Sequence, residues 1–177
     1  MAARTFLLAE ALKPATGEAF AELLHRADTT SSSVPTGADA LLALAERDPT
    51  RAGFYSTLTW TRKQLPLLTL RAWPAMGGLP DSWCQGSIAE TAEFVRRQGV
   101  PESATRLQQL VSLQQQVDRD ELVQWLSNVP LLVVPETLLH QRPLHPTAIW
   151  AVDDGSHRAI VLALLDVESV VALVGEP

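Results

Sequence analysis

The stretch TAIWAVDDGSHRAIVLALLDVESVVALVGEP, residues 147–177, decides the fold class of this chain. Two apolar runs, residues 147–152 and 158–165, flank an Asp-Asp-Gly-Ser sequence at 153–156. Apolar, β-rich runs on either side of an Asp-Gly pair predict a β-hairpin. The second run is nearly continuous, which predicts a strand covered on both faces. The end of the chain is therefore expected to lie inside a sheet.

Upstream of this stretch, a central cluster of helices is expected over about residues 88–127. Ser87 and Glu90 have the spacing of a capping box, and the helix that they open should end at Gly99. Further helix starts are expected at Pro101 and at Asp118 or Asp120, before the sheet resumes at Leu131.

Residues 49–73 fit either a helix or strands. Pro49 suits the first position of a helix capped by Asp48. Apolar and polar residues nevertheless alternate from Phe54 to Trp60, Thr, Tyr and Trp favour strands, and Pro66 would break a long helix. We therefore expect two strands here, so that residues 54–73 and 131–174 form a small antiparallel sheet.

The order of these elements predicts an α+β fold rather than an alternating βαβ chain. Two N-terminal helices precede the strands, and residues 1–48 are expected to form a helical segment that is semi-independent within a single domain, residues 1–177. The predicted core consists of Leu107, Leu110, Val111, Leu132, Val134, Ile149, Val161, Leu162 and Leu164.

Composition narrows the classes of function. The net charge of −6 argues against strong non-specific binding to nucleic acid. The apolar runs are shorter than the roughly 20 residues of a membrane span, and the N-terminus makes a poor secretory signal. A single cysteine and this absence of signals favour the cytoplasm, and the preference for Arg over Lys favours a bacterial source.

The chain contains no motif that identifies a reaction, so no catalytic residue, metal ligand or cofactor is predicted. Cys84 lies just before a capped helix, where a thiol can be activated, but a lone cysteine is more often a buried apolar residue. His140 and His145 have no spacing typical of a metal site, and Asp153, Asp154 and His157 are expected on a solvent-exposed turn.

One segment has the composition of a protein interface. Between Asp48 and Asp81 the chain contains no acidic residue, while arginine and aromatic residues alternate there. Trp, Tyr and Arg dominate the energetic centres of protein interfaces. The interface candidates are Tyr55, Trp60, Arg62, Arg71 and Trp73. The leading hypothesis is a non-catalytic protein-interaction module, such as an adaptor, an accessory subunit or an immunity-type inhibitor, with a protein partner or a second copy of itself.

Two alternatives stay open. The helices on either side of Gly99 have the outline of a helix-turn-helix, which would make the protein a DNA-associated regulator. The candidates for DNA contact are Arg97, Thr105, Arg106 and Gln109. The third reading is a small enzyme that uses Cys84 as its nucleophile.

Overall fold

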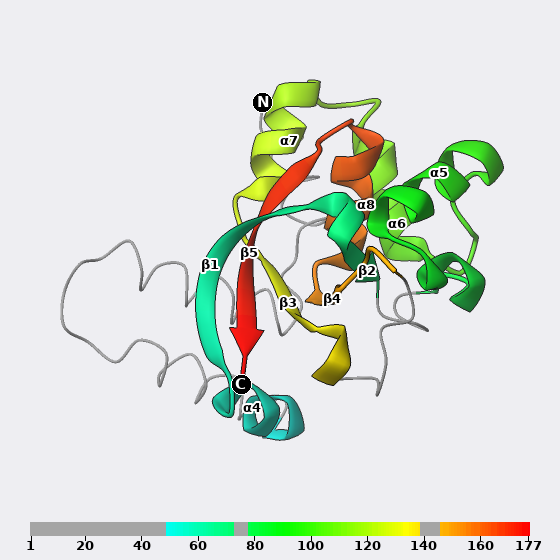
Figure 1. Cartoon of the computed structure of the whole chain (residues 1–177). Helices are drawn as coiled ribbons and strands as arrows, with labels where there is room; N and C mark the ends of the chain where they lie inside the picture. Colours follow the sequence, from blue (N-terminus) through cyan, green and yellow to red (C-terminus); the bar gives the residue numbers. More distant parts are fainter. Residues whose placement is uncertain (1–48, 73–77, 139–145) are drawn as a thin grey trace.

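A computed structural model describes residues 49–72, 78–138 and 146–177, which form a five-stranded mixed sheet packed against helices (Figure 1). Strand β5 is antiparallel to β1 and parallel to β3, and β4 is antiparallel to β3 and parallel to β2. The α+β class is confirmed, with a mixed rather than antiparallel sheet. The strands, in spatial order, are β1 (Thr59–Pro66), β5 (Ser169–Glu176), β3 (Leu131–Pro135), β4 (Trp150–Asp154) and β2 (Leu70–Ala72).

Helices α5 (Ile88–Gln98), α6 (Thr105–Leu113), α7 (Arg119–Ser127) and α8 (Ser156–Leu164) group on one side of this sheet (Figure 1). Both α5 and α6 pack mainly on α8. Helix α4 (Pro49–Ser56) packs against the opposite face of the sheet through Ala52 and Tyr55. Three short 3-10 segments complete the described fold: η1 (Leu67–Thr69), η2 (Asp81–Gln85) and η3 (Glu136–Leu138).

The hairpin predicted at residues 147–165 is wrong, because its second half is helix α8. The chain leaves β4 through Gly155, whose φ of 94° favours glycine, and turns directly into the helix. Residues 158–163 are all buried. A helix buried all round shows the same continuous apolar run as a strand buried on both faces, so periodicity could not separate the two.

The two strands expected over residues 54–73 are confirmed as β1 and β2, but the start of the first one is corrected. Residues 54–56 form the last turn of α4, and β1 begins only at Thr59. Pro49 takes the first helical position, as the rejected alternative required. Strand β1 ends at Pro66 and lies at the edge of the sheet, where proline and charged residues prevent pairing with another chain.

The predicted boundaries of the helix cluster are largely confirmed. The Ser87 hydroxyl accepts from the Glu90 amide at 3.2 Å, and the Glu90 carboxylate accepts from the Ser87 amide at 2.6 Å. Asp118 caps α7, with its carboxylate accepting from the Asp120 amide at 2.9 Å. Helix α6 is shorter than expected, since it begins at Thr105.

Most of the predicted core is also confirmed. The side chains of Val111 and Leu164 are partly buried, and the prediction for Ile149 is wrong because this residue is 49% exposed. It lies one residue before β4, and its side chain faces solvent whereas that of the preceding Ala148 is buried. The predicted positions that are fully buried are Leu107, Leu110, Leu132, Val134, Val161 and Leu162.

The predicted N-terminal helices, Trp73, His140 and His145 lie outside the described residues. Within those ranges, none of the helices has the length and apolar character that crossing a membrane requires.

Candidate functional site

The exposed face of α5 borders two adjoining hollows, which together form the candidate functional site. The first hollow, of about 500 Å³, lies between α5 and η2 and is called the η2 hollow. The second, of about 730 Å³, lies between α5, η1 and the turn from α8 to β5, and is called the η1 groove. Glu90 and Glu93 line both. The capping box that opens α5 therefore also positions a carboxylate between the two hollows.

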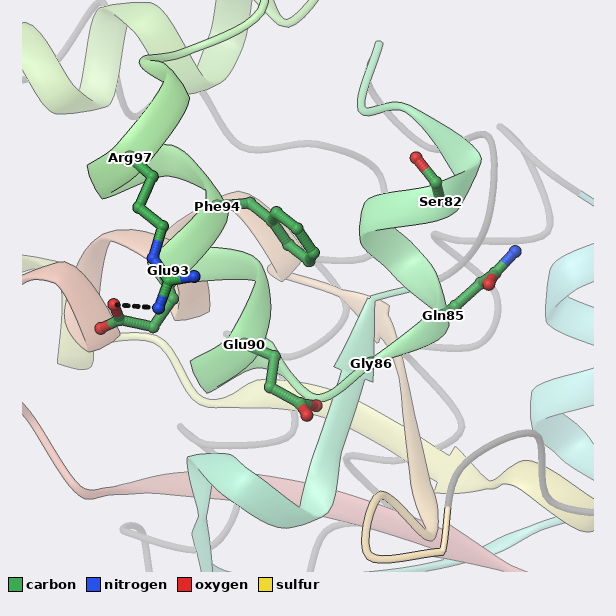
Figure 2. Close-up of a pocket in the computed structure, with 7 residues that line it drawn as sticks. All are labelled: Ser82, Gln85, Gly86, Glu90, Glu93, Phe94 and Arg97. Carbon is green, nitrogen blue, oxygen red and sulfur yellow. Dashed lines mark ion pairs between the residues drawn. The ribbon is translucent and has the colours of Figure 1, made fainter.

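The η2 hollow combines an aromatic wall with polar groups (Figure 2). The ring of Phe94 stacks on the ring of Trp83, with 5.7 Å between centroids and 14° between planes. Arg97 extends beside Glu93, and their nearest charged atoms are 4.0 Å apart. Ser82 and Gln85 of η2 line the hollow on the side opposite α5. This arrangement offers stacking and hydrogen bonding at an open surface.

Apolar side chains line part of the η1 groove. Pro66, Leu67 and Leu68 contribute one wall, and Val167 contributes from the turn after α8. Leu67 is buried, whereas the adjacent Leu68 is 53% exposed, the largest exposure of a large apolar side chain in the described part of the chain. The groove therefore presents one exposed apolar side chain beside polar groups.

The rim of the η1 groove is acidic. Glu90, Glu93, Asp166 and Glu168 line it, together with the single cation Arg96. The guanidinium of Arg96 donates to Asp166 at 2.6 Å and to the Ala163 carbonyl at 2.9 Å, and it also pairs with Glu93. With four carboxylates and one guanidinium, the rim carries an excess of negative charge.

A Schellman motif at the end of α8 sets the position of Asp166. The amide of Val167 donates to the Leu162 carbonyl at 3.0 Å, and the amide of Asp166 donates to the Ala163 carbonyl at 3.1 Å. Asp166 takes a φ of 58°, which is tolerated better by Asp than by most side chains. The motif reverses the chain and turns the Asp166 carboxylate toward Arg96 on α5.

The predicted interface residues do not form one surface in the described part of the chain. Tyr55 is fully buried, and its hydroxyl donates to the carboxylate of Asp153. Arg51 donates to the same carboxylate at 2.7 Å. Trp60 is partly buried against this cluster, and Arg62 is exposed. The network joins α4 to β4, and it corrects the expectation that Asp153 lies on an exposed turn.

Arg71 is also buried. On β2 its side chain forms an ion pair with Glu136 of η3, and it donates to the Cys84 carbonyl at 3.0 Å. These partners join β2 to η2 and η3, so Arg71 serves the interior of the protein rather than an exposed interface.

Three of the candidates for DNA contact, Arg97, Thr105 and Gln109, are exposed, and Arg106 is partly buried. Arg97 points along the η2 hollow, whereas the other three lie on α6. Because α5 and α6 both pack mainly on α8, they lack the close mutual packing expected of a helix-turn-helix.

Cys84 is buried, and burial, with a smaller effect from the charge of Asp81, raises the pKa of its thiol to about 11. A thiol with such a pKa stays protonated at neutral pH and is a weak nucleophile. Among the residues that the structure describes, no group of three or more His, Cys, Asp or Glu side chains has an arrangement suited to a metal ion.

Sequence reasoning missed the η1 groove because its walls come from separate segments, η1, α5 and the α8–β5 turn. The capping box was the one local signal at the site, and it indicated a helix start rather than a surface. Comparison with protein-family models, with curated proteins and with solved structures found no match.

Proposed function

We propose that the protein is a non-catalytic protein-interaction module, such as an adaptor, an accessory subunit or an immunity-type inhibitor, and that it binds its partner through the exposed face of α5. The observation that carries this proposal is the pair of adjoining hollows that share Glu90 and Glu93. Together they present apolar, aromatic and charged side chains over one continuous face. Such a mixture is typical of protein interfaces.

The chemistry of the hollows supports binding rather than a reaction. Their charged side chains are carboxylates and guanidinium groups, several of which pair with one another, as Glu93 does with Arg96 and Arg97. Gln85 lines the η2 hollow, and Cys84 precedes it in the sequence. The side chain of Cys84 is buried, and its thiol is protonated at neutral pH. A nucleophile needs a lowered pKa or a base within hydrogen-bond reach.

The test is capture of partners by the tagged full-length chain from the lysate of its own organism, with nuclease added. We expect a stoichiometric protein that survives nuclease, that is lost with Glu93→Arg, and that is retained with Glu102→Arg. Glu102 is an exposed acid that lines neither hollow, so it controls for the change in net charge. Capture of nucleic acid alone, or of no protein, would contradict the proposed function.

Retention of the partner by Glu93→Arg would keep the interaction function and move the binding surface away from α5. Circular dichroism of both variants must match that of the wild type. Since Glu93 is about half exposed, its substitution is expected to change stability by less than about 1 kcal/mol.

A further inference from the structure

We propose that the η1 groove binds a basic segment of a partner protein, with an apolar side chain of that segment on Leu68 and its lysine or arginine side chains facing Glu93, Asp166 and Glu168. This inference rests on the proposed function and specifies the chemistry of the partner.

The apolar contribution comes from the difference between two neighbouring leucines. Leu67 is buried in the main core, but Leu68 projects from the same 3-10 turn and remains 53% exposed at the groove. Covering an exposed leucine removes apolar surface from water, which favours binding in proportion to the area covered. A partner side chain of leucine or isoleucine type would make this contact.

The charge of the rim selects a basic partner. Four carboxylates line the groove, and Arg96 is engaged by Glu93, Asp166 and the carbonyl groups that end α8. The carboxylate of Glu168 has no hydrogen-bond or ion-pair partner among the described residues, so it is available to a cation from outside. Complementary charge at a rim increases the association rate and discriminates against acidic partners.

The walls of the groove are held in place before any partner arrives. The amide of Leu67 donates to the Glu168 carbonyl at 2.9 Å, which joins η1 to the start of β5. Arg96 joins α5 to the α8–β5 turn. A surface that needs little ordering loses less free energy on binding. The volume of about 730 Å³ suits a short segment with one or two anchoring side chains.

The test measures fluorescence anisotropy of a labelled peptide of alternating lysine and leucine, titrated with the full chain. Two matched peptides carry glutamate in place of lysine, or serine in place of leucine. We expect binding of the lysine-leucine peptide that weakens as salt is raised, and weaker binding of both matched peptides. Equal binding of the glutamate-leucine peptide would overturn the proposal.

Variants locate the binding. Glu168→Lys should weaken binding by about fivefold, because it removes one attraction and adds a repulsion. Leu68→Ser should also weaken it. Glu102→Lys and Leu138→Ser should bind as the wild type does. Leu138 is another partly exposed leucine, and it follows β3 at the sheet end opposite the start of β5.

Unchanged affinity in both groove variants would overturn the assignment of the groove. The lysate capture separates this failure from failure of the proposed function. A nuclease-resistant partner captured equally by Glu168→Lys and the wild type would leave the interaction function standing and remove the groove from it.

Discussion

Arg71 places a charged side chain inside the described core. Its side chain is fully buried, and one of its terminal nitrogens, Nη2, has no hydrogen-bond partner among the described residues. The ion pair with Glu136 compensates the charge in an interior where water cannot. Removing one member of such a pair leaves the other charge buried and unpaired.

A double-mutant cycle tests this account. Arg71→Met and Glu136→Leu should each lower the free energy of unfolding by about 3–5 kcal/mol, because each leaves an uncompensated charge. The double variant should lose much less than the sum, since two apolar side chains replace the pair. Urea unfolding of the four proteins measures the coupling. Additive losses would show that the pair does not act as a unit.

Because the thiol of Cys84 is buried, we expect the protein to lose stability at alkaline pH. Its pKa is raised to about 11 in the folded protein, whereas an unfolded thiol titrates near 8.5. The folded state therefore holds the proton more tightly. The contribution is fully present below about pH 8.5 and is lost between there and about pH 11, by at most about 1.4 kcal/mol per pH unit.

The measurement is urea unfolding at about pH 7.5 and at about pH 10, comparing the wild type with Cys84→Ala. The variant should lose less stability between the two pH values. Some loss should remain, since burial also raises the pKa of Tyr55. Equal losses in both proteins would show that Cys84 is not protected. Slow modification of the native thiol by a disulfide reagent would give independent support.

At the scale of elements, two glycines share a positive φ but differ in their surroundings. Gly78 has a φ of 79° and Gly99 a φ of 78°. A Cβ on Gly78 would lie 2.0 Å from the carbonyl oxygen of Ser103, whereas Gly99 has nothing within 4 Å of that position. The loop before η2 is therefore in close contact with the α5–α6 connection, whereas Gly99 at the end of α5 has free space where a Cβ would lie.

Alanine at these two positions should separate backbone strain from steric collision. Gly99 combines its positive φ with a ψ of 177°, a region that residues with a Cβ rarely adopt, so Gly99→Ala should cost about 1–3 kcal/mol from backbone strain alone. Gly78→Ala should cost more than about 3 kcal/mol, because the backbone of Ser103 must also move. Thermal unfolding of both variants measures the difference. Similar costs would mean that the contact at Gly78 relaxes freely.

At the scale of the whole molecule, β5 connects parts of the chain that are far apart in sequence. It pairs with β1 from Thr59↔Glu176 to Pro66↔Ser169, and with β3 on its other side. Ala172 at its middle is buried beneath the helices, while the adjacent Val171 is only partly buried and faces the other way. We therefore expect the cooperativity of unfolding to depend more on the face of β5 that packs against the α5–α8 helices than on its other face.

Ala172→Asp should remove the cooperative transition, because an unpaired carboxylate in that layer costs more than about 4 kcal/mol. Val171→Asp on the same strand should cost clearly less. Near-ultraviolet circular dichroism of the tryptophans and binding of an apolar dye measure the outcome. Equal damage from both substitutions would indicate that the two faces of β5 are equally packed.

The overall charge of −6 bears on the DNA-associated alternative. Non-specific affinity for DNA comes mainly from cations that replace counterions. We expect no retention of duplex DNA at physiological salt. Filter binding measures this, and binding at low salt that Arg97→Ala and Arg106→Ala abolish would instead support the alternative.

The sequence by itself determined the features that depend on near neighbours. The start of α5 needs only Ser87 and Glu90, three residues apart, and the cap of α7 needs only Asp118. The buried stripe of α6 follows from its helical spacing. The α+β class follows from the order of such local signals along the chain.

The tertiary structure decided the rest, because those features depend on residues brought together from distant segments. Residues 158–163 are enclosed by the sheet and by neighbouring helices, so their continuous apolar run fits a helix and a strand equally, and local periodicity could not decide between them. The buried Arg71 forms an ion pair with Glu136, which lies 65 positions away in the sequence. The η1 groove exists only where η1, α5 and the α8–β5 turn come together, so its acidic rim and exposed leucine could not be assembled from the sequence alone.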